Sequence, residues 1–590
     1  MAIWKERSSS LQRDVLNDSQ SSFKESQKPY PELIDRLLSS RGLSESEIEL
    51  ILNPKLSLLK DPFLLKDMDL AVSRIKQAYK NKEKICIYAD FDLDGTSGLA
   101  VLKTALENLG FKDVSYYQPK RLSEGYGFHP HAVEELKTIG IDLIITVDVG
   151  ITSHAAFIKA KELGIDVILT DHHLPAETLP EAYCVVNPNQ KDCTSKLGYL
   201  CGAGVAFYLA RALKRAFWED EAFPKHEWDL KDLLDLFCIA TLTDMVPLVD
   251  DNRVLVKHGM VALQNTKRPG LKVLLEALDL KGRALSSQDI SIKFAPKLNA
   301  LSRMESDILP IHIYLEESLS KAKSMVDQVL KNNITRQNLQ SDAEAKAHEL
   351  LKDWSYDDFV FVASEEFHRG VIGLIATKLS QDYNRPAFVG SVNSEGVVVG
   401  SGRLPVGYET GLVDALGFSS ENLTRYGGHS AAAGFELHAD KMSQLIESLV
   451  AFYQQLKQNP REVEIDFDTT AKLSDVNSQF MKWYDHIGPY GVGFSIPLLR
   501  FNKLMIQKIT ELKGGHLKIQ LVETELTFES SESKIKTVDA FLFSPQEKHR
   551  KLIKVGQIFD ILGEIQWNYF RNKQSIQILV KDIKLSGNLS

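Results

Sequence analysis

The sequence predicts a multidomain α/β fold, with a parallel sheet in its first half and a small β-barrel at its end. From residue 85 onward, short apolar runs alternate with amphipathic segments, which is the pattern of parallel strands joined by helices. The chain has 590 residues, more than a single hydrophobic core usually organises. After residue 463, alternating segments separated by turn residues indicate an additional β domain.

Three apolar runs define the predicted parallel sheet. They cover residues 84–88, 141–147 and 167–170, and an acidic residue stands at the end of each. Helical segments are expected over 98–109 and 154–163. Because ligands of such sheets bind at the carboxyl ends of the strands, the acidic groups are expected to meet in one site.

The remaining segments differ clearly in composition. Residues 1–28 are polar and rich in Ser and Gln, and are expected to be poorly ordered. Pro310 stands near the start of a long charged helical stretch, and the last segment fits a barrel of the OB type. The predicted parts are a polar helical segment over 1–60, the sheet domain over 61–305, a long connecting helix over 306–355, a smaller α/β domain over 356–460 and the barrel over 461–590.

Composition excludes several classes of protein. No apolar run reaches about 18 residues, so no membrane span is expected, and the first residues lack the apolar stretch of a secretory signal. Five scattered cysteines without a CxxC pair indicate reduced thiols in the cytoplasm. The net charge of −9 argues against a uniformly basic nucleic-acid binder, although residues 501–590 carry +4. Ordinary charge scatter explains that asymmetry equally well.

The acidic run Asp90-Phe91-Asp92-Leu93-Asp94 is the first candidate site. Clustered carboxylates repel one another unless cations occupy the site. An EF-hand loop would need Glu at its twelfth position, where Val101 stands. A haloacid-dehalogenase-like phosphatase would use Asp92 as a nucleophile with one Mg²⁺, but would leave the second motif described below without a role. A solvated acidic loop is the simpler alternative.

The second motif, Asp171-His172-His173, follows a predicted buried strand. Imidazole nitrogen suits Mn²⁺ or Zn²⁺ better than Mg²⁺, although a pair of surface histidines is the alternative. Asp148 ends a strand and Asp244 lies in an apolar segment, where an unpaired carboxylate is costly. Each could instead be a cap or turn residue. Together these residues fit two divalent cations about 3.5–4 Å apart, which can activate water and bridge a phosphate.

In this order, these motifs resemble the DHH phosphoesterase superfamily, and most closely its RecJ family of single-strand-specific 5′→3′ DNA exonucleases. The similarity extends from about residue 31 to 583. It implies a DHH domain, a connecting helix, a DHHA1 domain and an OB-fold. It also implies release of 5′-mononucleotides in DNA repair and recombination, with two divalent cations, Mn²⁺ preferred and Mg²⁺ the alternative. The implied metal ligands are Asp92, Asp94, Asp148, His172 and Asp244.

The same resemblance implies further roles at the catalytic centre and along the substrate. Asp90 is a ligand or supports one, Asp171 orients a histidine, and His173 meets the scissile phosphate. Guanidinium groups can bind phosphates through paired hydrogen bonds, although a surface ion pair is the alternative for each arginine. The implied substrate-binding residues are Arg121 in 119–127, Asn299 and Arg303 in 296–303, Ser401 and Arg403 in 400–403, and His429 in 427–434.

Four positions depart from the family pattern: Val149, Ser302, Leu404 and Phe494. None of them is an expected metal ligand, so the departures bear on the fit of the 5′ end and on the barrel surface. Candidates for base stacking on the barrel are Tyr490, Trp567 and Tyr569, with core packing as the alternative.

Two other functions are weighed against the exonuclease. A hydrolase of short oligonucleotides or signalling dinucleotides would not need the barrel. An inactive replication scaffold would have lost ligands, yet every expected ligand is present. The implied partners are single-stranded DNA with a 5′ end, single-strand-binding protein and a RecQ-type helicase, for a protein expected to be a cytoplasmic monomer without membrane contact.

Overall fold

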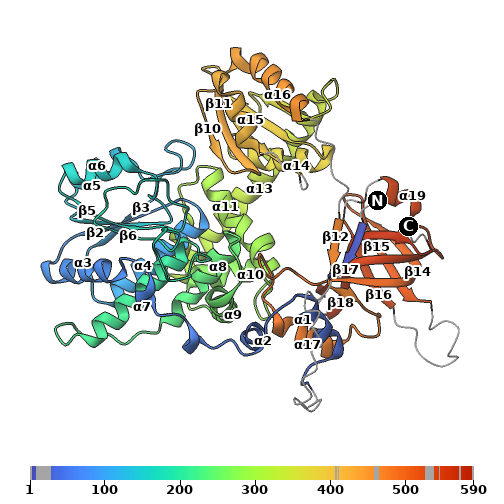
Figure 1. Ribbon diagram of the computed structural model, residues 1–590, viewed down its shortest axis with the longest axis horizontal. Coiled ribbons are helices and arrows are strands. Elements are labelled where there is room, and N and C mark those ends of the chain that lie inside the picture. Colours follow the sequence, from blue (N-terminus) through green and yellow to red (C-terminus); the bar gives the residue numbers. More distant parts are fainter. Residues whose placement is uncertain are drawn as a thin grey trace, which may run out of the picture. The chain divides into compact units, whose positions relative to one another are not determined.

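The computed structural model forms two compact units, one of residues 58–461 and one of residues 1–57 with 462–590 (Figure 1). It describes residues 3–7, 28–405, 408, 411–456, 464–524, 537–543, 545, 547–570 and 573–587. Within these ranges no helix has the length and apolar character to cross a membrane. The finer division into five parts stays a prediction.

The predicted parallel sheet is present in the larger unit. Its strand order is β3-β2-β4-β5-β6, and all neighbours run parallel. The two edge strands were not predicted, because both are short and β3 is only half-buried. The strands are β2 (Ile85–Ala89), β3 (Val114–Tyr117), β4 (Leu143–Val147), β5 (Asp166–Thr170) and β6 (Cys184–Val186).

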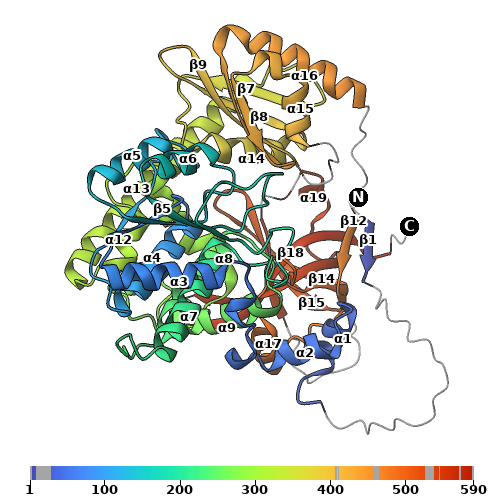
Figure 2. The same cartoon turned by 60° about the vertical axis from the view of Figure 1, so that its left-hand side comes forward.

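Helices cover both faces of this sheet. In both views α5 and α6 lie on one face, and α3, α4 and α7 lie on the other (Figures 1 and 2). This places the carboxyl ends of the strands at an edge that α4 and α7 approach through their N-termini. The bounds are α3 (Met68–Asn81), α4 (Leu93–Asn108), α5 (Pro130–Thr138), α6 (His154–Glu162) and α7 (Gly202–Glu219).

Helix α4 begins earlier than the helix expected over 98–109. The helix begins at Leu93, because the Asp92 carboxylate caps it, and Gly95 lies in its first turn. A Cβ at Gly95 would lie 2.5 Å from the carbonyl oxygen of Asp90. Glycine therefore allows the helix to begin directly against the end of β2.

The predicted continuous helix over 306–355 is two helices, α12 (Pro310–Leu315) and α13 (Leu319–Leu350). The break has a local cause: Ser318 is extended, and its hydroxyl accepts from the Lys321 N–H, so α13 starts with its own cap. The helices between the sheet and α12 are α8 (Leu234–Thr243), α9 (Asp250–Gln264), α10 (Pro269–Ala277), a π-helical segment (Asp289–Phe294) and α11 (Ala295–Arg303).

A second sheet follows α13, as predicted for a smaller α/β domain. Its order is β10-β11-β9-β8-β7, with only β7 and β8 parallel. Its strands are β7 (Val360–Ser364), β8 (Ala387–Val392), β9 (Val397–Arg403), β10 (Arg425–Gly428) and β11 (Ala432–His438). Its helices are α14 (Ile372–Tyr383), α15 (Leu412–Phe418) and α16 (Met442–Leu456).

The smaller unit contains the predicted C-terminal barrel. Its sheet has the order β13-β14-β15-β16-β18-β17, and an additional pairing of β14 with β17 closes it. The elements are β12 (Glu464–Phe467), β13 (Thr469–Thr470), α17 (Ser478–Ile487), β14 (Leu498–Leu512), β15 (His516–Glu523), β16 (Thr537–Leu542), α19 (Glu547–Leu552), β17 (Ile558–Phe570) and β18 (Lys573–Leu585).

The N-terminal segment folds with the barrel, which the sequence did not indicate. The expectation of disorder over 1–28 is wrong for β1 (Ile3–Glu6), which pairs in parallel with β12, while residues 8–27 lie outside the described residues. Helices α1 (Glu32–Ser40) and α2 (Glu45–Leu52) contribute apolar side chains to the barrel core. Arg41 also binds both oxygens of the buried Asp468 carboxylate, at 2.9 and 3.2 Å.

Candidate active site

Helix N-termini hold two carboxylates of the acidic run in place. Oδ1 of Asp92 accepts from the N–H groups of Asp94 and Gly95, both at 2.9 Å. The two oxygens of Asp94 accept from Gly202 and Ala203 at the start of α7, at 2.6 and 2.8 Å. Since helix N-termini favour negative charge, α4 and α7 offset part of the cost of placing these two carboxylates together.

Asp148 follows β4 in a left-handed backbone conformation with φ of 62°, and is 2% exposed. The chain of α7 passes so closely that a Cβ at Gly202 would lie 2.4 Å from Cβ of Asp148. The glycine is therefore required where the two segments meet. Strained backbone of this kind persists where the surrounding structure fixes it, often at functional sites.

Asp171 organises the histidine pair. Its buried carboxylate accepts from the backbone N–H groups of Ile151, His172 and His173, and from Nδ1 of His173 at 2.7 Å. Burial alone would raise the pKa of Asp171, but the His173 contacts and the backbone donors hold it below its ordinary value. In turn, the Asp171 carboxylate raises the pKa of His173 to about 9 against the opposing effect of burial. The predicted orienting role fits this geometry.

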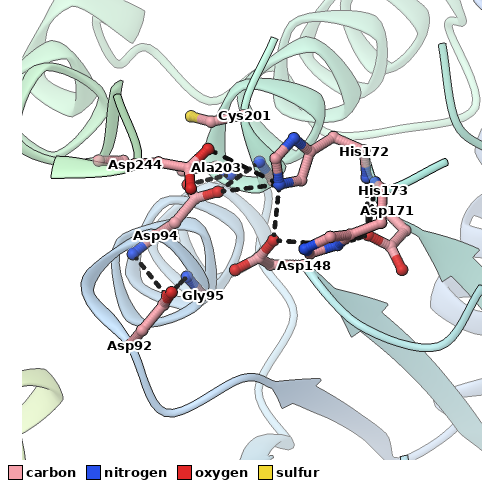
Figure 3. Close-up of polar contacts among 12 residues, drawn as sticks. Asp92, Asp94, Gly95, Asp148, Asp171, His172, His173, Cys201, Ala203 and Asp244 are labelled. Atoms are coloured by element: carbon pink, nitrogen blue, oxygen red, sulfur yellow. Dashed lines mark hydrogen bonds and ion pairs between the residues drawn. The ribbon is translucent and has the colours of Figure 1, made fainter. Parts of the chain in front are cut away.

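Nε2 of His172 lies at the centre of the remaining carboxylates (Figure 3). It is 3.2 Å from Oδ1 of Asp148 and 3.7 Å from an oxygen of Asp94 and of Asp244. Asp244 follows the last residue of α8, so a helix C-terminus brings it to the strand ends. Burial lowers the pKa of His172, which favours the neutral ring that a metal needs as a ligand.

The donor set fits divalent cations. Four buried atoms aimed into the cluster have no hydrogen-bond partner among the described residues: Oδ1 of Asp90, Oδ1 of Asp148, Oδ2 of Asp244 and Nε2 of His172. Three trios have ligand atoms within 4.8 Å of one another: Asp90–Asp92–Asp148, Asp94–His172–Asp244 and Asp148–His172–His173. The first two share no residue. Carboxylate oxygen with one imidazole nitrogen is a donor set typical of Mn²⁺ and related ions. Asp90 therefore belongs with the five predicted ligands by position.

The charges of this cluster also favour cations. Burial and the neighbouring Asp92 raise the pKa of Asp90 to about 8, and burial with Asp94 raises that of Asp244 to about 8. Burial raises the pKa of Asp148 as well. The raised pKa values mean that these carboxyl groups ionise reluctantly without a counter-charge, and a bound divalent ion would favour their ionised forms.

Comparison with known proteins identifies the family. Residues 84–241 match the N-terminal domain of the DHH family, and residues 467–582 match the RecJ OB domain. The chain is 31% identical to single-stranded-DNA-specific exonuclease RecJ of Escherichia coli over 575 residues, which cover 94% of this chain and 96% of the relative. For the same enzyme of Bacillus subtilis, identity is 31% over 558 residues, 94% of this chain and 68% of the relative. The chain belongs to the RecJ family.

Solved structures agree with this assignment. RecJ of Thermus thermophilus in complex with Mn²⁺ matches with a TM-score of 0.73 and 26% identity, over 92% of this chain and 75% of that one. The predicted membership in the RecJ family is confirmed, as are the fold class and the single-strand exonuclease function that it implied. The predicted dependence on divalent cations agrees with the bound Mn²⁺ of that relative.

In this RecJ-family chain, the three predicted arginines lie half-buried without ion pairs among the described residues. The Arg121 guanidinium stacks over the Phe91 ring at 5.0 Å, beside the acidic run. Arg403 donates to Oγ of Ser401 at 2.8 Å, and Arg303 donates to the carbonyl of Gly370 at 3.1 Å. Arg121 interacts electrostatically with Asp90 and Asp92, but none of the three forms a direct ion pair among the described residues, so the surface ion pair considered from the sequence does not describe these arginines.

Asn299 and His429 have weaker structural support. Asn299 lies half-buried on α11, where its carbonyl accepts from Ser302. His429 is exposed between β10 and β11, where its backbone N–H donates to the carbonyl of Ala432. Their substrate-binding roles stay predictions.

Sequence reasoning missed two groups at the centre. The Tyr126 hydroxyl lies 3.3 Å from Nδ1 of His173, and Nε2 of Gln118 donates to the Asp90 carbonyl at 2.7 Å. Tyr126 lies inside the segment 119–127 that pointed to Arg121, and Gln118 directly precedes it. The only indication of these two residues in the sequence was their position within or next to that segment.

Three of the four departures contribute to packing. Val149 is buried in the core beneath α5 and α6, and Leu404 packs on the core of the second sheet. The Phe494 ring stacks on Tyr490 at 5.7 Å and lies under Arg41. Of the predicted stacking residues, Tyr490 and Trp567 pack on the barrel core, whereas Tyr569 is 40% exposed. Core packing, the alternative weighed for these rings, thus describes Tyr490 and Trp567.

Proposed function

We propose that this chain digests single-stranded DNA from its 5′ end and releases 5′-mononucleotides. The observation that carries the proposal is the convergence of two trios of carboxylate and imidazole ligands on one sheet edge, with arginines that form no direct ion pair among the described residues of the same unit. The anionic ligands can bind divalent cations, and the guanidinium groups can bind phosphates. The unit therefore has groups for both the metal ions and the substrate of a phosphodiester hydrolysis.

The two trios, Asp90–Asp92–Asp148 and Asp94–His172–Asp244, would hold the two divalent ions. When bound, such ions supply a water of lowered pKa and charge stabilisation at the phosphate. The chain's own part is to fix this arrangement: α4 and α7 orient Asp92 and Asp94, and Asp171 orients His173.

His173 is proposed to contact the scissile phosphate. Its Nδ1 binds Asp171, which leaves Nε2 to donate to a phosphate oxygen. The raised pKa of His173, about 9, supports a protonated ring at neutral pH. Arg121, beside Asp90 and Asp92, is placed to bind the same or the next phosphate.

The 5′→3′ polarity is proposed to depend on Ser401 and Arg403. Arg403 donates to the Ser401 hydroxyl and to the carbonyl of Gly402, at 2.8 and 2.7 Å, which fixes its orientation. Its remaining N–H groups can donate to a terminal phosphate. A pocket that neutralises a terminal phosphate would select the end of the strand and exclude closed circles.

The test compares linear and circular single strands, duplex and a dinucleotide, with Mn²⁺ or with EDTA. We expect Mn²⁺-dependent hydrolysis of the linear strand only, and its loss in His172→Ala with unchanged circular dichroism. Hydrolysis of the circle, preference for the dinucleotide, or full activity of His172→Ala would each contradict the proposal.

By family resemblance, we also propose a cytoplasmic monomer that receives strands from a RecQ-type helicase and acts in the presence of single-strand-binding protein. Stimulation of digestion by each purified partner is the measurement that checks this. Equal rates with and without the partners would contradict it.

A further inference from the structure

The larger unit contains an unpaired basic cluster, defined here as Arg121, Lys297, Arg303, Arg336 and Arg403. None of the five makes an ion pair with a carboxylate among the residues that the structure describes. Burial and the charges of Arg121, Arg336 and Arg403 lower the pKa of Arg303 to about 10. Apart from the Asp90 and Asp92 carboxylates that act on Arg121, the described residues supply no counter-charge to this cluster, so a bound anion would stabilise it.

The members of this cluster are connected electrostatically. Arg121 interacts with Asp90 and Asp92, and Arg303 interacts with Arg121, Arg336 and Arg403. Lys297 interacts with Arg336 in the same way. Helix α11, which carries Lys297 and Arg303, packs against α13, which carries Arg336. The cluster therefore extends from the proposed metal centre to two packed helices.

Arg336 is held in a fixed orientation by neutral partners. Its Nη1 donates to Oε1 of Gln340 and its Nη2 to Oδ1 of the buried Asn333, both at 2.7 Å. Nε2 of Gln340 donates to Glu344, also at 2.7 Å, which fixes the Gln340 amide. The guanidinium is thus positioned without being neutralised, and two bonds leave three of its five N–H donors for a ligand.

We propose that Arg336, with Lys297 beside it, binds an internal phosphate of the single strand, beyond the scissile one. The site deepens the proposed function and rests on it. A strand phosphate fits better than a free anion, because Arg303 and Arg121 connect this site electrostatically to the proposed metal centre, where the scissile phosphate would bind. A planar guanidinium with paired free donors also matches phosphate geometry.

The test uses Arg336→Gln, Arg336→Lys and the control Lys331→Gln, which removes a charge from the exposed face of the same helix. Strand binding is measured in Ca²⁺ over a range of salt, separately from cleavage in Mn²⁺. Oligonucleotides carrying one neutral methylphosphonate at each successive linkage locate the contact.

For the wild-type protein and Lys331→Gln, we expect one internal linkage whose neutralisation weakens binding roughly tenfold. Arg336→Gln should bind about tenfold more weakly, should show no further loss at that linkage alone, and should lower the salt slope by ~0.7. Arg336→Lys should recover the salt slope but not the full affinity, because a point charge lacks the paired donors.

Equal sensitivity of Arg336→Gln and wild type at every linkage would overturn the proposal. So would equal weakening at all linkages with an unchanged salt slope, which indicates a structural role. If the wild type binds with the expected pattern but hydrolyses nothing, the proposed function fails while this site stands.

Discussion

At the scale of single residues, four buried atoms of the cluster have no hydrogen-bond partner among the described residues. They belong to Asp90, Asp148, His172 and Asp244. In a structure without a role for cations, such buried groups would each cost free energy. Hydrogen bonds from neighbouring residues fix the cluster: Asp171 accepts from the backbone of His172, and α7 donates to the adjacent Asp94. Under the proposed function, bound metal ions would offset the repulsion among these carboxylates.

Asp148→Asn tests that statement. The change removes one charge from the cluster, so the metal-free protein should become more stable by about 1 kcal/mol, while stabilisation by Mn²⁺ and strand cleavage are lost. Thermal unfolding in EDTA and in Mn²⁺ measures both effects. Asp113→Asn, at an exposed aspartate, is the control. Lower stability of Asp148→Asn in EDTA would show that the carboxylate serves the fold rather than a metal.

At the scale of elements, motifs and apolar periodicity predicted those strands and helices whose positions depend on the local sequence. The three central strands and the acidic residues at their ends were predicted, because each strand is an uninterrupted apolar run. The start of α4 was not, since it depends on the Asp92 cap and on the approach of Asp90 to Gly95. The break before α13 was missed for a similar reason. Ser318 caps the start of α13 and so interrupts a charged stretch that looks continuous in the sequence.

The π-helical segment Asp289–Phe294, which leads into α11 and Arg303, provides a prediction on pH. Burial opposes ionisation of Asp289, but Arg283, Lys293 and the Ser286 N–H hold its pKa below the ordinary value. A lowered folded-state pKa stabilises the fold above the unfolded value, near 3.9, and this contribution is lost as the pH falls through the folded value.

Asp289→Asn should therefore destabilise the protein by about 2–3 kcal/mol at pH 7, and by progressively less below about pH 4. Denaturant unfolding at a series of pH values measures the difference from wild type. A difference that stays constant between pH 7 and pH 3 would contradict the assigned charge interactions.

At the scale of the whole molecule, the N-terminal segment belongs to the barrel unit. The sequence could not predict this, because the pairing of β1 with β12 joins residues more than four hundred positions apart. The Arg41–Asp468 pair is buried, with side chains 5% and 1% exposed. The N-terminal segment thus supplies apolar core side chains and a charged partner for Asp468 to a barrel whose strands are formed by the C-terminal part of the chain.

Arg41→Ala should lower the stability of the barrel unit by about 3 kcal/mol, because Asp468 would lose its bidentate partner in a buried site. Mn²⁺ binding, which uses residues of the other unit, should not change. Lys5→Ala is the matched control, since its pair with Glu464 is exposed and 4.0 Å long. Equal stability of Arg41→Ala and Lys5→Ala would exclude a stabilising role for the Arg41–Asp468 pair.

The central claim is that the cluster around His172 hydrolyses a single strand from its 5′ end. The most direct measurement is a time course in Mn²⁺ on a single strand labelled at one end and then at the other, with wild type and Asp148→Asn. We predict that the 5′ label is released at once as a mononucleotide, that the 3′ label stays on a shortening strand, and that Asp148→Asn releases neither. Early release of a mononucleotide from the 3′ end, or turnover by Asp148→Asn, would contradict the account.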